Sequence, residues 1–162
     1  MSILFSASEI ITMAIEVEKN GLNFYRAMVA KTKNEKAKTI FSFLATEETQ
    51  HIKTFRELLK DLSPVAMSHT AEAEYNSYLN ALTSSRIFTP DVDMDKLVKE
   101  IKDDIGAVDI AIKAEQESIL FYYELREQTK AESRANIEAI IEEEKMHFAK
   151  LTQLKADLAK KQ

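Results

Sequence analysis

Apolar residues recur along the chain at alternating spacings of three and four, the pattern of one buried helix face. Four long segments show it. They run from about residue 8 to 30, 37 to 62, 101 to 128 and 131 to 158. Glycine and proline number only 2 each, so long helices meet few local breaks. The sequence therefore predicts four long amphipathic helices and an all-α fold.

Polar and helix-capping residues mark the expected helix boundaries. The first helix opens at a capping box formed by Ser6 and Glu9, and the last at a second match formed by Thr129 and Glu132. A polar stretch over residues 31–36 separates the first two helices. Pro64 ends the second helix, because the residue before a proline is disfavoured in helical geometry.

A less regular segment covers residues 63 to about 100. Its apolar residues suggest one short helix: Tyr75, Tyr78, Leu79 and Leu82. The third long helix begins either with Asp93 as its cap or after a kink at Asp103 and Asp104. His69 is expected to be an ordinary surface histidine.

Two helix pairs with tight turns, joined by a crossover of ~40 residues, are typical of a ferritin-like four-helix bundle. We expect a single domain over residues 1–162, and the polar turns argue against an extended coiled coil.

Composition narrows the chemistry. There is no cysteine, which excludes disulfides, thiolate nucleophiles and Cys-ligated iron centres. The net charge of -5 disfavours nucleic acid as a partner. No apolar run approaches the ~20 residues of a membrane span. The N-terminus lacks the features of a secretory signal, so a cytoplasmic protein is expected.

Six polar residues interrupt the predicted apolar faces at mid-helix. They are Glu18, Glu48, His51, Glu115, Glu144 and His147. Singly, such a glutamate is usually solvated and such a histidine is usually a satisfied core residue. Together they bring four carboxylates into one apolar core, which is costly unless cations neutralise them. Two divalent ions balance the four negative charges, so the pattern predicts a dimetal site.

An internal repeat supports this prediction. Residues 14–25 match residues 111–122 at a shift of 97, and residues 47–51 match residues 143–147 at a shift of 96. Each half therefore supplies one Glu-x6-Tyr helix and one Glu-Glu-x-x-His helix. Pseudo-two-fold symmetry around a shared centre follows.

Neighbouring residues receive weaker assignments. Glu47 and Glu143 lie one step round the helix and are expected to be solvated or to support the ligands, and Glu117 is expected to point away. Tyr25 and Tyr122 share a face with Glu18 and Glu115. They either pack in the core with a hydroxyl hydrogen bond, or support the ligands and relay protons or electrons. Iron is the first choice of metal, with manganese and zinc as alternatives.

These motifs, with the long crossover, resemble the rubrerythrin branch of the ferritin-like superfamily over residues 8–158. The resemblance implies a di-iron protein, often a homodimer, that reduces hydrogen peroxide or O₂ with electrons from a rubredoxin-like donor. Rubrerythrins often carry a rubredoxin domain with four cysteines, which is absent here, so a separate donor protein is expected. They also carry a further glutamate three residues after the third-helix ligand. Here that residue is Ser118, and its counterpart in the first helix is Gly21.

Three functions remain open from sequence. The first is a di-iron oxidoreductase that reduces peroxide or O₂, with Glu48 and Glu144 as the expected bridging ligands. The second is a ferroxidase that oxidises and sequesters iron, since four glutamates and two histidines are closer to bacterioferritin ferroxidase centres. A 24-subunit cage is disfavoured because few residues follow Leu158. The third is a structural dimetal bundle without turnover.

Overall fold

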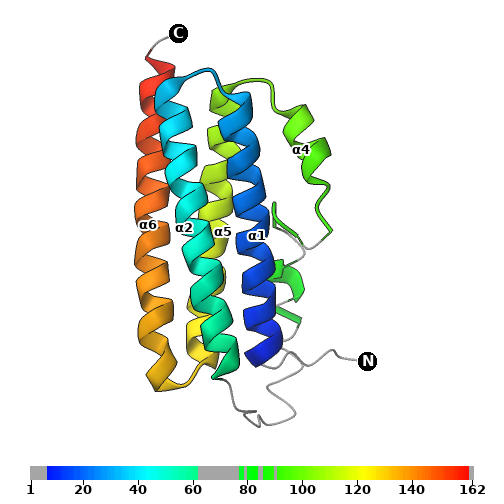
Figure 1. Cartoon of the computed structure of the whole chain (residues 1–162). Coiled ribbons are helices and arrows are strands. Elements are labelled where there is room, and N and C mark those ends of the chain that lie inside the picture. The colour runs from blue at the N-terminus through cyan, green and yellow to red at the C-terminus, as the bar shows by residue number, and fades with distance from the viewer. Residues whose placement is uncertain (1–6, 62–76, 79, 84–85, 90, 161–162) are drawn as a thin grey trace.

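Four long helices form the body of the molecule. The computed structural model describes residues 7–61, 77–78, 80–83, 86–89 and 91–160. The long helices are α1 (Ala7–Lys31), α2 (Glu35–Lys60), α5 (Asp104–Gln128) and α6 (Ala131–Ala159), and α4 (Met94–Glu100) is short. They lie side by side as a bundle (Figure 1), which confirms the predicted fold class. The described ranges contain no β-strand, and no helix in them is long and apolar enough to cross a membrane.

The two halves of the chain form two helix pairs that pack against each other, α1 with α2 and α5 with α6. α1 and α2 run in opposite directions, and α5 begins at the end of the bundle opposite to the end of α2, so α5 runs parallel to α2 (Figure 1). α4 lies beside α1, and the Lys31 ammonium at the end of α1 donates to the carbonyls of Val98 and Ile101, both at 2.6 Å. The predicted long crossover is thus confirmed. Residues 77–78 and 80–83 are helical, while His69, Tyr75 and Leu79 lie outside the described residues.

Both predicted starts of the third helical segment are used. The Asp93 carboxylate accepts from the Lys96 amide at 3.0 Å and caps α4. Asp103 accepts from the Gly106 amide at 2.7 Å and caps α5. Between them, Ile101 has extended backbone geometry. The segment is therefore two helices separated by a short break, and each aspartate satisfies amides that a helix start leaves unpaired.

The predicted capping box at Thr129 is wrong. Lys130 is the N-cap of α6 and makes no side-chain capping bond. The Thr129 hydroxyl donates instead to the carbonyls of Leu125 and Arg126, at 2.8 and 2.9 Å. The preceding helix uses the hydroxyl to satisfy its own last carbonyls, which are unpaired at a C-terminus. The other predicted boundary residues, Ser6 and Pro64, lie outside the described residues.

Two apolar clusters fill the bundle, one toward each end. One contains Phe24, Phe41 and Leu154, and the other contains Ile11, Phe55 and Ile140. The six polar residues lie between these clusters along every long helix. The fold thus carries its polar residues to mid-bundle, with apolar packing on both sides.

The buried stripe of α5 includes small residues as well as large apolar ones. Ile105, Ile112 and Ile119 are only partly buried, whereas Ala111 and Ser118 are buried. A bundle helix packs against two neighbours, so its buried stripe is wider than a single line of large apolar residues. Small residues on that stripe go unnoticed when only large ones are traced.

Candidate metal centre

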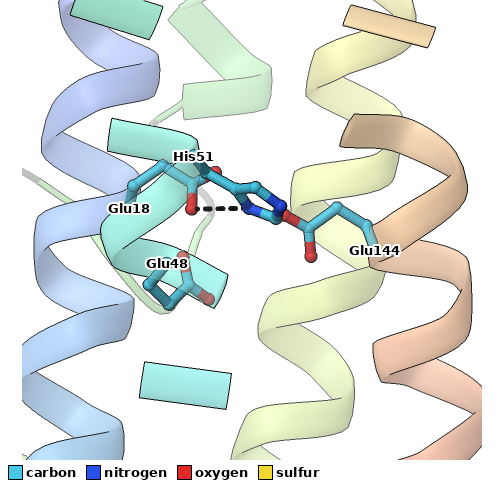
Figure 2. Close-up of side chains that lie close together, drawn as sticks. All are labelled: Glu18, Glu48, His51 and Glu144. Carbon is cyan, nitrogen blue, oxygen red and sulfur yellow. Dashed lines mark hydrogen bonds and ion pairs between the residues drawn. The ribbon is translucent and has the colours of Figure 1, made fainter. Parts of the chain in front are cut away.

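The six predicted ligands converge in the core. Their exposed fractions are between 1% and 5%: Glu18, Glu48, His51, Glu115, Glu144 and His147. Figure 2 shows four of them pointing toward one another from α1, α2 and α6. Donor atoms of Glu18, Glu48, His51 and Glu144 lie within 4.8 Å of one another, as do those of Glu115, Glu144 and His147. Glu144 belongs to both groups.

Both imidazoles present Nδ1 to the carboxylates. His51 Nδ1 lies 3.3 Å from a Glu18 oxygen and 3.1 Å from a Glu144 oxygen. His147 Nδ1 lies 3.2 Å from the other Glu144 oxygen and 3.7 Å from Glu115. The two rings stack with centroids 5.7 Å apart and planes inclined by 25°. The Nδ1 atoms are therefore the ones available to metal ions in the core.

The outer nitrogens face the first glutamates of the Glu-Glu pairs, each from the opposite half of the repeat. His51 Nε2 lies 2.9 Å from a Glu143 oxygen, and His147 Nε2 lies 3.9 Å from Glu47. A carboxylate on the far ring nitrogen fixes the tautomer and orientation of a metal-bound histidine. Both expectations for these glutamates fit the structure, because their side chains are 47% exposed at Glu143 and 30% at Glu47 and also face the histidines.

The two tyrosines also form hydrogen bonds to residues of the opposite half of the repeat. Tyr25 of α1 donates its hydroxyl to Glu115 of α5, and Tyr122 of α5 donates to Glu18 of α1. Both rings are at most 1% exposed. Core packing with a hydrogen bond is thus the observed arrangement, and the acceptors are the two carboxylates that the Glu-x6-Tyr helices contribute. Each tyrosine therefore restricts where one of these carboxylates can lie.

Without metal, protons neutralise this cluster. Burial and the neighbouring carboxylates Glu18 and Glu144 raise the pKa of Glu48 well above its usual value, and burial and Glu144 do the same for the pKa of Glu115. Burial lowers the imidazole pKa values, but the surrounding carboxylates outweigh it and raise the pKa of His51 to about 12 and that of His147 to about 10. Burial also opposes ionisation of Glu144, yet its hydrogen bonds to Glu115, His147 and His51 hold its pKa below the usual value. The closed core is thus compatible with shared protons.

Gly21 provides the space that the Glu48 carboxylate occupies. A Cβ built on Gly21 would lie 3.1 Å from both the carboxyl carbon and one oxygen of Glu48. Such contacts are tighter than ordinary packing, so a Cβ at this position would push the carboxylate by a few tenths of an ångström. Sequence reasoning noted Gly21 only as a missing ligand and did not identify this steric role.

Crossover residues complete the surroundings of the site. Arg86 is 8% exposed, its guanidinium carbon lies 4.0 Å from the centroid of the Phe121 ring, and its Nη2 donates to the Glu117 carbonyl at 3.0 Å. The Glu117 carboxylate accepts from the Ile87 amide at 2.8 Å, in line with the expectation that it turns away from the core. Phe88 is 4% exposed and packs on Phe24. These contacts lay beyond sequence reasoning because residues 86–89 have no helical periodicity.

The donor set fits a pair of first-row divalent ions. Four carboxylates and two imidazoles offer oxygen and nitrogen ligands, which suit iron, manganese or zinc. Each ion can draw on one histidine and at least two carboxylates, and Glu144 is within reach of both donor groups. The cluster is thus able to bind metal, and its donor chemistry does not select one of these metals.

Comparison with known proteins agrees with this geometry. The rubrerythrin family model matches residues 9–155. A Thermotoga maritima structure assigned to the ferritin-like di-iron carboxylate proteins aligns with a TM-score of 0.72 and 26% identity, covering 94% of this chain and 95% of that one. A hypothetical protein from Pyrococcus furiosus has a TM-score of 0.69 and 23% identity over 96% of this chain and 92% of its own, which shows the same fold. The encapsulin nanocompartment cargo protein EncC of Myxococcus xanthus is 38% identical over 63 residues, which span 39% of this chain and 48% of that relative.

Proposed function

This chain belongs to the rubrerythrin family, and on that premise we propose that it is a di-iron oxidoreductase that reduces hydrogen peroxide, or O₂, to water. The observation that carries the proposal is the convergence of four carboxylates and two imidazole Nδ1 atoms in one buried cluster. Such a set, drawn from four helices, is the ligand arrangement of di-iron carboxylate bundles.

The residues divide the work as follows. Glu18, Glu48 and His51 would hold one ion, and Glu115 and His147 would hold the other, with Glu144 within reach of both. Tyr122 and Tyr25 orient Glu18 and Glu115 through their hydroxyl protons.

The outer glutamates keep the histidines in the binding tautomer. Glu143 accepts the Nε2 proton of His51, which leaves the Nδ1 lone pair directed at the core. Glu47 stands in the same relation to His147 at a longer distance of 3.9 Å. We expect the His51 side to be held more tightly than the His147 side.

Two ferrous ions, when bound, supply the two electrons that convert H₂O₂ and two protons into two molecules of water. We expect the electrons that restore the ferrous form to come from a rubredoxin-like partner, because the 162 residues contain no cysteine to ligate such a centre. The apolar clusters on both sides of the site exclude bulk water from it. We also expect a homodimer that works in the cytoplasm.

Stopped-flow mixing tests the reaction. Ferrous protein with stoichiometric H₂O₂ should be oxidised much faster than free Fe²⁺, and it should consume one peroxide per two irons. Oxidation at the rate of free Fe²⁺ would contradict the proposal. Glu142→Gln, on the exposed face of α6, is the matched control and should behave as wild type.

A second candidate is a ferroxidase that delivers oxidised iron for storage. Two observations favour it: Gly21 and Ser118 stand where rubrerythrins can supply further ligands, and one relative is a cargo protein of an encapsulin nanocompartment. With excess Fe²⁺ and O₂, a ferroxidase would turn over many irons per site and keep them in solution. Gel filtration separates the assemblies, because a dimer elutes near twice 18.5 kDa whereas a 24-subunit cage elutes far earlier.

A further inference from the structure

A surface pocket lies beneath the crossover. It has a volume of about 540 Å³, and its walls come from α1 and from crossover residues, including Met13, Val17, Arg86 and Phe88. The pocket is large compared with H₂O₂. Two guanidinium atoms of Arg86, Nε and Nη1, are buried and have no hydrogen-bond partner in the part of the chain that the structure describes.

A second, much smaller cavity lies directly against the metal ligands. It measures about 10 Å³ and is bounded by Glu48, Glu115 and Tyr25 on one side and by Gly21 and Ser118 on another. This volume is roughly what one water molecule requires, at ~10–15 Å³. The space exists because residues 21 and 118 are small: a side chain on Gly21 would meet the Glu48 carboxylate at 3.1 Å.

Two residues, Val17 and Phe88, border both spaces. They form the partition between the outer pocket and the inner cavity. Phe88 is 4% exposed, and its ring centroid lies 5.4 Å from that of Phe24. The partition is therefore one aromatic ring from the crossover and one aliphatic side chain from α1.

Hydrogen bonds on both sides hold Phe88 in this place. The Ile87 amide donates to the Glu117 carboxylate of α5 at 2.8 Å, and the Thr89 carbonyl accepts from the Asn20 side chain of α1 at 2.9 Å. The crossover is thus tied to α1 and α5 immediately before and after Phe88. A ring anchored by its neighbours can change rotamer without release of the whole segment.

We propose that the outer pocket and the inner cavity form the access route to the metal centre, with Phe88 and Val17 as a size filter that admits molecules of the size of H₂O₂ or O₂. This inference rests on the proposed function, since it concerns how the oxidant of that reaction reaches the same site. Phe88 and Val17 belong to neither group of possible metal donors, so they act as specificity-determining residues.

Azide binding to the ferric protein tests the route without peroxide turnover. Phe88→Ala opens the partition and should raise the azide association rate by about tenfold, since passage through a gate scales with the fraction of time it is open. Val17→Phe should lower the rate by a similar factor, and Phe88→Leu should give an intermediate rate. Leu154→Ala, a cavity variant in the apolar core whose residue lines neither space, should leave it unchanged.

Peroxides of two sizes give a second readout. The ratio of the oxidation rates with cumene hydroperoxide and H₂O₂ should rise in Phe88→Ala and not in Leu154→Ala. Azide rates that are equal in Val17→Phe, wild type and Phe88→Ala at equal metal content would overturn the route, whatever the peroxide activity. Azide rates in the expected order in a protein that does not reduce peroxide would uphold the route and refute the proposed reaction.

Discussion

Metal binding should expel protons from the core, and their number follows from the structure. In the metal-free protein, both imidazoles carry a proton at neutral pH, because their pKa values are about 12 for His51 and about 10 for His147. Burial and neighbouring carboxylates likewise favour protonated Glu48 and Glu115. Metal ligation requires neutral imidazoles and ionised carboxylates. Two ions should therefore release about four protons, two from the histidines and two from the glutamates.

The same count fixes the pH dependence of metal affinity. Each released proton makes binding about tenfold tighter per pH unit, so the product of the two association constants should rise about 10⁴-fold per pH unit while all four groups remain protonated. Affinity should fall correspondingly steeply on acidification. The sign follows from competition, because protons and metal ions occupy the same lone pairs.

Calorimetry measures the proton count directly. Zn²⁺ is titrated into metal-free protein at pH 7 in two buffers of different ionisation enthalpy, and the difference in heat gives the protons released per ion. Glu142→Gln is the control, because this exposed carboxylate pairs with Lys145 at 2.6 Å and lies outside the cluster. Release of fewer than about one proton per pair of ions would refute the reasoning, since the metal-free core would then hold ionised carboxylates and neutral imidazoles.

Three further outcomes are expected. Gly21→Ala should weaken metal binding by about tenfold, because its Cβ would press on Glu48 at 3.1 Å; unchanged affinity in a zinc titration would contradict the steric role. Tyr122→Phe removes the hydroxyl proton from Glu18 and should lower metal affinity by about 10- to 100-fold with helical circular dichroism retained; full affinity would show that the hydrogen bond does not orient the ligand. The Tm of the metal-free protein should fall by about 5 °C or more between pH 6 and pH 9. The raised imidazole pKa values stabilise the fold fully below pH 6.5, and this contribution declines steadily from pH 6.5 until it is lost at about 10 for His147 and about 12 for His51. The raised carboxyl pKa values act in the same direction from pH 4.5 upward, and a Tm that rises with pH would contradict the shared-proton account.

The positions of the site residues could be predicted from the sequence because these polar residues interrupt the regular spacing of apolar residues along each helix. Glu18 and Glu115 stand on otherwise apolar helix faces, and the repeat at a shift of 97 places them in equivalent helices. The caps at Asp93 and Asp103 were predictable for a similar reason, since each acts within its own turn. Local spacing is enough where the physical cause is local.

Contacts between helices were beyond the sequence. The contact of Glu143 with His51 depends on how α6 packs beside α2, and one residue's rotation on either helix would replace it by solvent. The predicted capping box at Thr129 is wrong for a different reason. Its motif fits the start of α6, but the carbonyls at the end of α5 accept the hydroxyl proton instead. Phe88 lies in an irregular segment whose placement is set by hydrogen bonds to α1 and α5, so no period marks it as buried.

The buried carboxylates need positive counter-charge, which pointed to metal. The same need explains why the core can close without metal, because protons can supply that charge. Four ionised carboxylates in an apolar interior would repel one another strongly, and burial alone opposes each charge. Protons on Glu48, Glu115 and the two imidazoles remove that repulsion and leave Glu144 as an ionised partner of both histidines. Protons and metal ions are thus alternative counter-charges for one preformed cavity. The helices need not rearrange when metal ions replace protons, so the metal-free bundle should keep its helical content. Metal binding should then add redox chemistry to a site that is already assembled.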